Sequence, residues 1–191
     1  MTLWLARHAR PLVAPGVCYG QLDVAADEAA TRFSATQLAA LLPAHSRVAA
    51  SPLQRCAQLA QALQQQRPDL LVETDARLQE MNFGDWEGRA WADISADELR
   101  AWTDDFAHYQ PGGHGENVTT FMARVADTFD AIDLAAPTTL WITHAGVIRA
   151  VDLLLRGVRH LDHAAQWPTA APDYGQWQTR DLPASADDHS A

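Results

Sequence analysis

The chain has 191 residues, a length that suits one domain with a sizeable core, and we expect residues 1–182 to form it. The formal net charge of -10 argues against nucleic-acid and anionic-membrane partners, because both bind preferentially to a basic surface. Cys18 and Cys56 are too few for a disulfide framework, which favours a reducing compartment. No apolar run is long enough for a signal peptide or a membrane span, so we predict a cytoplasmic protein.

The start of the chain carries a cluster of basic side chains. Residues 2–6 are apolar and predict a buried strand, which runs directly into Arg7, His8 and Arg10. In open α/β sheets, ligands bind outside the carboxyl ends of the strands. Basic side chains at such an end indicate an anion site. A charged loop is the alternative interpretation for the Arg-His pair alone.

The segment after this strand is predicted to be an ordered loop. Residues 11–23 are rich in proline and glycine and lack a helical period. Because the loop continues directly from His8, it is placed to fold over the same crevice. Tyr19 and Gln21 are its candidate ligand contacts, with packing as the alternative for Tyr19.

A helix and a short strand are predicted next. The alanine-rich residues 27–42 have an amphipathic pattern, with Phe33, Leu38 and Leu41 among the apolar positions. Residues 47–50 then predict a strand.

A second helix is predicted to begin at Ser51 and Pro52. These are the residue types preferred at a helix N-cap and at the first helical position. Arg55 then lies in the first turn, at the same edge as His8. The helix dipole disfavours a basic side chain there, which suggests that an anion compensates it, with a surface arginine as the alternative.

A loop with three carboxylates follows a third predicted strand over residues 70–73. Residues 77–88 contain Glu80, Asp85 and Glu87 among aromatic residues and glycines, without a regular period. The segment is too apolar for a solvated loop, so we expect it to be packed.

The middle of the chain predicts helices outside the sheet. Residues 91–109 have helical spacing in their apolar positions, typical of one or two short helices whose tryptophans pack in the core or a lid. A glycine-rich loop over residues 110–116 precedes a helix over residues 117–134, and His114 in that loop is a candidate substrate contact.

The opening pattern recurs near the end of the chain. Residues 138–143 predict a strand that runs into His144 at the start of a helix. A helix N-terminus presents free amides and positive potential, so His144 is placed to help hold a phosphate, and Gly146 would permit close approach. An edge strand over residues 174–182 and a polar, frayed tail over residues 183–191 complete the chain.

Four of these segments match the motifs of one known family. They are Arg7-His8-Ala9, Ser51-Pro52-Leu53-Gln54-Arg55, residues 78–88 and residues 142–149. In this order they resemble the histidine phosphatase superfamily, the phosphoglycerate mutase-like enzymes. Within it, residues 16–23 resemble the α-ribazole phosphatase branch, and Ala9 stands where the family usually has glycine.

The resemblance implies phosphoryl transfer through a covalent phosphohistidine. In this scheme a nitrogen of His8 attacks phosphorus, while Arg7, Arg55 and His144 surround the phosphate. The predicted substrate contacts are Tyr19, Gln21, Arg7, Arg55, His144 and Ala145.

Glu80 matches the family residue that protonates the leaving oxygen and later activates water, and Asp85 and Glu87 are the alternatives. The resemblance implies no metal and no cofactor. His160 and His163 have a helical spacing that could bind a metal, but no third ligand follows an obvious pattern.

Together these observations predict an α/β fold, a three-layer sandwich with a mainly parallel central sheet and a small helical cap over residues 85–115. The predicted function is a metal-independent phosphomonoesterase acting on a small molecule, with α-ribazole 5′-phosphate first. The alternatives are a broad-specificity phosphatase, a protein phosphohistidine phosphatase and a phosphate-binding pseudoenzyme. The oligomeric state stays open.

Overall fold

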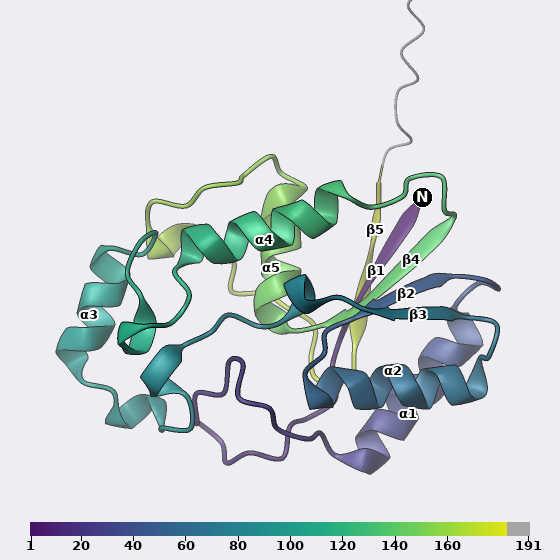
Figure 1. Ribbon diagram of the computed structural model, residues 1–191, viewed down its shortest axis with the longest axis horizontal. Coiled ribbons are helices and arrows are strands. Elements are labelled where there is room, and N and C mark those ends of the chain that lie inside the picture. The colour runs from purple at the N-terminus through teal and green to yellow at the C-terminus, as the bar shows by residue number, and fades with distance from the viewer. Residues whose placement is uncertain (183–191) are drawn as a thin grey trace, which may run out of the picture.

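The computed structural model describes residues 1–182, and its centre is a five-stranded sheet with the strand order β3-β2-β4-β1-β5 (Figure 1). Adjacent strands run parallel except β5, which is antiparallel to β1. The predicted α/β fold with a mainly parallel sheet is therefore confirmed, while the predicted tail lies outside the described residues. The strands are β1 (Thr2–Arg7), β2 (Arg47–Ala50), β3 (Leu71–Thr74), β4 (Thr138–Thr143) and β5 (Trp177–Asp181).

Helices cover both faces of this sheet. One pair, α1 and α2, packs on one face, and a second pair, α4 and α5, packs on the other, while α3 stands beyond the ends of the strands (Figure 1). The α-helices are α1 (Glu28–Leu41), α2 (Gln54–Gln66), α3 (Ala96–Asp104), α4 (Val118–Asp130) and α5 (Ala145–Leu154).

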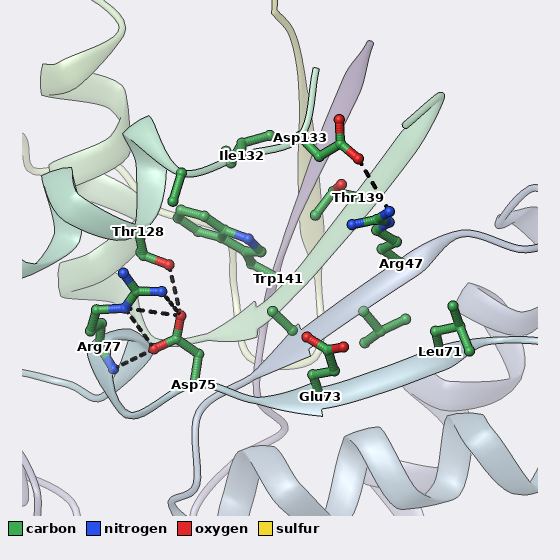
Figure 2. Close-up of a pocket in the computed structure, with 13 residues that line it drawn as sticks. Arg47, Leu71, Glu73, Asp75, Arg77, Thr128, Ile132, Asp133, Thr139 and Trp141 are labelled. Carbon is green, nitrogen blue, oxygen red and sulfur yellow. Dashed lines mark hydrogen bonds and ion pairs between the residues drawn. The ribbon is translucent and has the colours of Figure 1, made fainter. Parts of the chain in front are cut away.

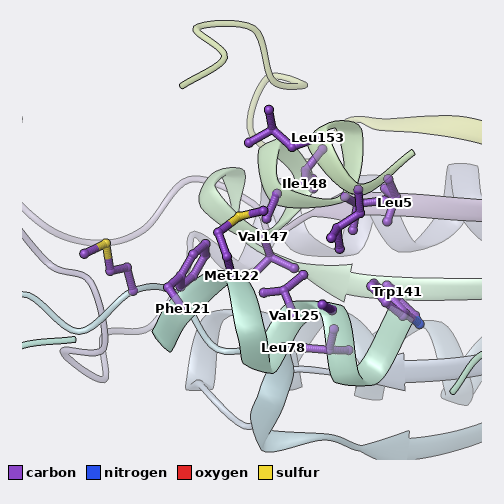
Figure 3. Close-up of a cluster of buried hydrophobic side chains, with 14 of the residues drawn as sticks. Leu5, Leu78, Phe121, Met122, Val125, Trp141, Val147, Ile148 and Leu153 are labelled. Carbon is purple, nitrogen blue, oxygen red and sulfur yellow. The ribbon is translucent and has the colours of Figure 1, made fainter. Parts of the chain in front are cut away.

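The two faces follow from the alternation of side chains along the strands. Leu3 and Leu5 of β1 belong to the core with α4 and α5, in which Figure 3 labels Leu5, whereas Ala6 belongs to the core with α1 and α2. In β4, Trp141 belongs to the first core and Ile142 to the second. Because both faces are buried, the middle of each strand is a continuous apolar run, residues 3–6 in β1 and 140–142 in β4, as in parallel strands generally.

Around α3, aromatic side chains form a small core of their own. Trp86 is fully buried beside Ile94 and Cys18, and its indole nitrogen donates to Glu98 at 3.0 Å. Ser95 caps α3. Trp91 and Trp102, the tryptophans of residues 91–109, pack against this small core, as predicted. We keep residues 85–115 as the proposed bounds of the cap.

Some details of the predicted elements are wrong. Phe33 and Leu41 are 63% and 56% exposed, because α1 buries small residues and Leu38 instead of its largest ones. The second helix begins at Gln54, three residues after the predicted cap Ser51. His160 follows the end of α5, so it does not share a helix with a second metal ligand.

Candidate active site

Three parallel strands deliver polar side chains to one edge of the sheet. His8 follows β1, Ser51 follows β2 and His144 follows β4. The backbone N–H of His8 donates to the carbonyl oxygen of Thr143 at 3.1 Å, so the pairing of β1 with β4 continues into the site. The carboxyl edge predicted to hold a ligand is thus the place where these side chains meet.

His8 is a buried imidazole with one nitrogen free. The residue is 2% exposed, and its Nδ1 lies 2.7 Å from the carbonyl oxygen of Ala9. Because a carbonyl oxygen only accepts, Nδ1 donates the proton and the lone pair lies on Nε2. Burial, reinforced by the charge of Arg55, lowers the pKa of His8 to about 3, so the ring is neutral at pH 7. A neutral imidazole with a free Nε2 can act as a nucleophile.

His144 lies beside His8, with 5.1 Å between the two ring centroids. Its Nε2 is 2.9 Å from Ser51 Oγ and 3.5 Å from Cys56 Sγ. Burial first, and then the neighbouring His8, lower the pKa of His144 well below its ordinary value. Ser51 therefore holds His144 in place and does not cap α2 as predicted.

Arg55 is completely buried in the first turn of α2, so the alternative of a surface arginine is wrong. Its two terminal nitrogens donate to the carbonyl oxygens of Leu22 at 3.0 Å and Gly20 at 2.6 Å. Its Nε is buried without a partner, and no carboxylate within residues 1–182 pairs with the guanidinium. A buried cation with only neutral partners favours an anionic ligand.

Arg7 repeats this arrangement from β1. Its Nη1 donates to the carbonyl oxygen of Pro172 at 3.0 Å, and its Nε is buried without a partner among the described residues. The guanidinium carbon lies 3.8 Å from the centroid of the Tyr174 ring. We call Arg7, His8, Arg55 and His144 the histidine cluster.

Two tyrosines from distant parts of the chain cover this cluster. The hydroxyl of Tyr19 lies 2.8 Å from that of Tyr174, and the Tyr19 ring centroid is 5.2 Å from the guanidinium carbon of Arg55. Burial raises the pKa of Tyr19, so its hydroxyl is protonated. The predicted fold of residues 11–23 over the crevice is consistent with this contact.

Glu80 lies at the N-terminus of α5. Its Oε2 accepts from the backbone N–H of Gly146 at 3.0 Å, and its Oε1 accepts from that of Met81 at 3.0 Å. A β-carbon at Gly146 would stand 2.1 Å from Oε1, so glycine lets the carboxylate approach the helix end. The structure thus brings Glu80 to the helix that His144 begins.

The alternatives to Glu80 occupy other positions. Glu87 Oε1 accepts from the backbone N–H groups of Gln21 at 2.9 Å and Phe83 at 2.8 Å, so this carboxylate holds two loops together. Asp85 has an exposed side chain 3.8 Å from Nδ1 of His114, which is also exposed. The geometry therefore favours Glu80 among the three carboxylates.

The remaining predicted contacts lie in the framework around the cluster. The Gln21 side chain donates to the carbonyl oxygen of Glu80 at 3.0 Å, which fixes the main chain there. Ala145 is the first residue of α5, where backbone amides lack partners within the helix. Ala9 is fully buried, and its carbonyl oxygen fixes the tautomer of His8.

A separate hollow of about 320 Å³ lies beside β2 and β3, and none of its lining residues belongs to the histidine cluster (Figure 2). Four of its five charged side chains pair with one another, and Glu73 is the fifth. Asp75 accepts from Arg77 and from Thr128, each at 2.8 Å, and Arg47 pairs with Asp133 at 3.1 Å. We therefore do not assign it a ligand.

A neutral imidazole beside two guanidinium groups that have no carboxylate partner in the described chain, at the carboxyl edge of an α/β sheet, is an arrangement suited to an anionic group such as phosphate. The sequence model of the histidine phosphatase superfamily (branch 1) matches residues 3–179. The chain belongs to this superfamily, which confirms the resemblance stated from its motifs. No curated protein sequence matches the chain significantly.

Solved structures of similar proteins include phosphatases. A mycobacterial glucosyl-3-phosphoglycerate phosphatase is 26% identical, with a TM-score of 0.73 over 93% of this chain and 88% of the other. A candidate α-ribazole-5′-P phosphatase from Escherichia coli is 25% identical, with a TM-score of 0.77 over 94% and 89% of the two chains. The protein TTHB049 from Thermus thermophilus is 26% identical, with a TM-score of 0.69 over 96% and 95%.

Tyr174, Ser51 and Cys56 contribute to the site without having been predicted to do so. The topology could have indicated Tyr174. Because β5 runs antiparallel to β1, the residues just before β5 lie near the residues just after β1. Gly175, the neighbour of Tyr174, donates to the carbonyl oxygen of His8 at 3.0 Å. The residue type of Ser51 indicates a helix cap and gives no sign of its contact with His144.

Among residues 1–182, no helix is long and apolar enough to cross a membrane. Within the same residues no three His, Cys, Asp or Glu side chains are grouped closely enough to hold a metal ion.

Proposed function

We propose that the chain is a phosphomonoesterase that acts through a phosphohistidine on His8, with α-ribazole 5′-phosphate as its first candidate substrate. The observation that carries the proposal is the pair Arg7 and Arg55. Each places a buried Nε without a partner beside a neutral imidazole, and neither has a carboxylate counterion in the described part of the chain. A phosphate would satisfy both donors and balance both charges.

In the first step, His8 Nε2 attacks phosphorus and the bond from phosphorus to the leaving oxygen breaks. The proton held by Nδ1 stays on the ring, where the carbonyl oxygen of Ala9 stabilises the charge that develops. Arg7 and Arg55 supply the positive charge that phosphoryl transfer requires around the equatorial oxygens, so the scheme needs no metal.

Glu80 serves the leaving oxygen. In the protonated form it gives its proton to the departing alkoxide, and the resulting carboxylate then removes a proton from the water that attacks the phosphohistidine. The second step releases inorganic phosphate, restores neutral His8 and returns the proton to Glu80. Atoms and protons therefore balance over the two steps.

Two observations support a ring-bearing substrate. A cavity of about 500 Å³ that includes Glu80 in its wall has five aromatic side chains among its fourteen lining residues. In addition, the candidate α-ribazole-5′-P phosphatase from Escherichia coli has the same fold over nearly the whole chain. A sugar phosphate of the kind named for the mycobacterial neighbour would meet few polar partners in such a cavity.

The test is a panel of phosphomonoesters assayed in EDTA. It contains α-ribazole 5′-phosphate, phosphoglycerates, sugar phosphates, nucleotides, a phosphohistidine peptide and p-nitrophenyl phosphate. We expect the highest kcat/KM for α-ribazole 5′-phosphate. Equal rates across the panel would favour the broad-specificity alternative. Preference for the peptide would favour a protein phosphatase, and binding without turnover would favour the pseudoenzyme.

A further inference from the structure

A cavity that adjoins Glu80 lies between α3 and the first turns of α4 and α5. Its volume is about 500 Å³, within the range of small-molecule sites. Residues 164–169 close one side of it. We call it the aromatic cavity, and its principal apolar side chains are Phe83, Trp102, Phe106, Val118, Phe121 and Trp167.

The aromatic cavity adjoins the proposed active site at Glu80, although none of its lining residues belongs to the histidine cluster. Glu80 and Gly146 belong to its wall, and these two residues are joined by the 3.0 Å bond at the start of α5. A phosphoester whose leaving oxygen reaches Glu80 would therefore place the group beyond that oxygen in this cavity.

Two hydrogen-bond donors in the cavity wall have no acceptor among residues 1–182. They are Nε1 of Trp102 and Nε of Arg149, and both atoms are buried. Most buried donors in folded proteins have a partner, so an unmatched pair in one cavity requires an explanation. A ligand that carries an acceptor would provide one.

The guanidinium of Arg149 is held in place at its other end. Its Nη2 donates to the carbonyl oxygen of Thr169 at 2.9 Å, and no carboxylate in the described chain lies within ion-pair distance. Burial lowers the pKa of Arg149, whereas the negative charge of Glu80 raises it. Once Glu80 has given its proton to the leaving oxygen, it is a carboxylate that faces the same cavity. An anionic group on the leaving half would then be repelled, and a neutral acceptor fits better.

We propose that the aromatic cavity binds the leaving-group half of the substrate and selects a neutral, planar aromatic ring that bears a hydrogen-bond acceptor, with Arg149 and Trp102 as the specificity-determining donors. This inference rests on the proposed function, since it assigns the leaving group of that reaction. A saturated ring would lose the stacking and edge contacts with the aromatic walls. A purely hydrocarbon ring would leave both donors unsatisfied.

The test uses the full chain and primary alkyl phosphates that differ only in the ring. The parent compound is 2-(2-naphthyl)ethyl phosphate, and its partners are the quinoline isomers in which one ring CH is replaced by nitrogen. Because every leaving alcohol is primary, differences in kcat/KM report recognition of the ring. We expect at least one quinoline isomer to exceed the naphthalene compound on the order of tenfold to a hundredfold.

Two variants assign the preference to its donors. Arg149→Met keeps an apolar stem without the guanidinium, and Trp102→Phe keeps a ring without the N–H. Each should lower the quinoline-to-naphthalene ratio. Arg156→Met is the matched control, because Arg156 is exposed, lies outside the cavity and carries the same charge. A ratio that persists in both cavity variants would overturn the assignment.

Calorimetry with the free alcohols separates this inference from the proposed function. If the quinoline alcohol binds more tightly and Arg149→Met removes the preference, the cavity assignment stands even where no phosphoester is hydrolysed. If all the phosphoesters are hydrolysed at similar rates and the alcohols bind equally, the cavity assignment fails and the phosphatase remains.

Discussion

The histidine cluster and the aromatic cavity meet at Glu80, yet they are built differently. In the cluster, main-chain groups fix most of the polar atoms: Ala9 holds His8, and the carbonyl oxygens of Leu22 and Gly20 hold Arg55. In the cavity, aromatic rings from segments outside the sheet form the wall, and two donors stay unmatched in the described chain. The sheet therefore positions the chemistry, and the surrounding segments shape recognition.

Because of this difference, we expect substitutions in the cluster and substitutions in the cavity to have different effects on activity. Changes in the cluster should depress the phosphoryl-transfer steps for every substrate, because each substrate presents the same phosphate. Changes in the cavity should alter the ratio between substrates. Glu80 lines the cavity and serves the reaction at the cluster, so its substitution should do both, since the need for its proton depends on the leaving group.

The largest effect is expected for His8→Ala, which removes the proposed nucleophile. Turnover of all phosphomonoesters should fall by about 10⁴-fold or more, the scale for loss of a covalent catalyst. Acid-labile, base-stable labelling from a radioactive phosphomonoester should disappear as well. His144→Ala is the matched control, because it removes a buried imidazole 5.1 Å away and should keep the label. Label that persists without His8 would assign the nucleophile elsewhere.

Glu80→Gln should give the next largest effect, and only for poor leaving groups. Phosphorylation of the enzyme by alkyl phosphates should slow by about 10² to 10⁴, the range for general acid catalysis, whereas nitrophenyl phosphate should suffer far less. Burst-phase rates are needed because Glu80 also assists water in the second step. Equal loss for both substrates would mean that Glu80 acts through charge or structure.

Gly146→Ala offers a second route to the same result. Its added carbon would stand 2.1 Å from Glu80 Oε1, so the carboxylate must move away from the helix end. We expect the same leaving-group dependence with a smaller loss, because the carboxylate is displaced and not removed. If Glu80→Gln shows leaving-group dependence and Gly146→Ala does not, the acid group of Glu80 matters but its exact position does not. Leaving-group dependence in Gly146→Ala alone would mean that the effect does not arise from the acidity of Glu80.

Arg55→Ala should reduce kcat/KM uniformly across substrates. Loss of one preorganised charge donor costs about 2 to 4 kcal/mol of transition-state stabilisation. The matched control is Arg10→Ala, because Arg10 is exposed and close to His8 only in sequence. A loss below about tenfold for Arg55→Ala, in protein shown by circular dichroism to be folded, would place Arg55 outside the phosphate pocket.

Burial of neutral imidazoles should make the stability of the fold depend on pH. The pKa of His8 is lowered from 6.5 to about 3 on folding, so between these values the unfolded chain binds a proton that the folded chain does not. The free energy of unfolding therefore falls as the pH falls, by about 2 kcal/mol for His8 between pH 7 and pH 5. His144, whose pKa burial also lowers, acts in the same direction.

Urea unfolding at the two pH values measures this dependence. His8→Asn should weaken it, whereas His108→Asn should not, because His108 is exposed. An unchanged pH dependence in His8→Asn would show that the imidazole is not held neutral in the folded chain.

Much of the fold followed from local pattern. The strand over residues 138–143 is a short run of β-branched and apolar residues, so its place and type were predictable. His8 and His144 lie side by side because parallel strands end at one edge. The prediction that Phe33 lies on the apolar face of its helix was wrong. The buried face of α1 is the one that packs against α2, and it consists mainly of small residues.

The parts of the site that escaped prediction depend on contacts between distant segments. Ser51 has the residue type of a helix cap, and only the position of β4 shows that its hydroxyl faces His144. The unmatched donor of Trp102 depends on how α3 packs, which no short motif encodes. The position of Tyr174 beside His8 could be predicted only if the antiparallel direction of β5 relative to β1 were known.

The smallest predicted effect concerns the hydroxyl pair of Tyr19 and Tyr174, which joins the two segments that cover the cluster. Tyr174→Phe removes a 2.8 Å hydrogen bond but keeps the ring 3.8 Å over Arg7, so it should lower stability by about 0.5 to 1 kcal/mol, because the pair is partly exposed. Activity should change by less than about tenfold for all substrates alike, since the phosphate donors stay in place.

A double-mutant cycle sharpens this expectation. Tyr19→Phe should cost as much as Tyr174→Phe, and the double variant should cost no more than either, because one bond can be lost only once. Unfolding in urea measures each free energy. Additive losses would show that the hydroxyls act independently, for instance through water. A change in the quinoline-to-naphthalene ratio would show that the tyrosines belong to the aromatic cavity and not to the phosphate end, and the boundary between the two regions would have to be redrawn.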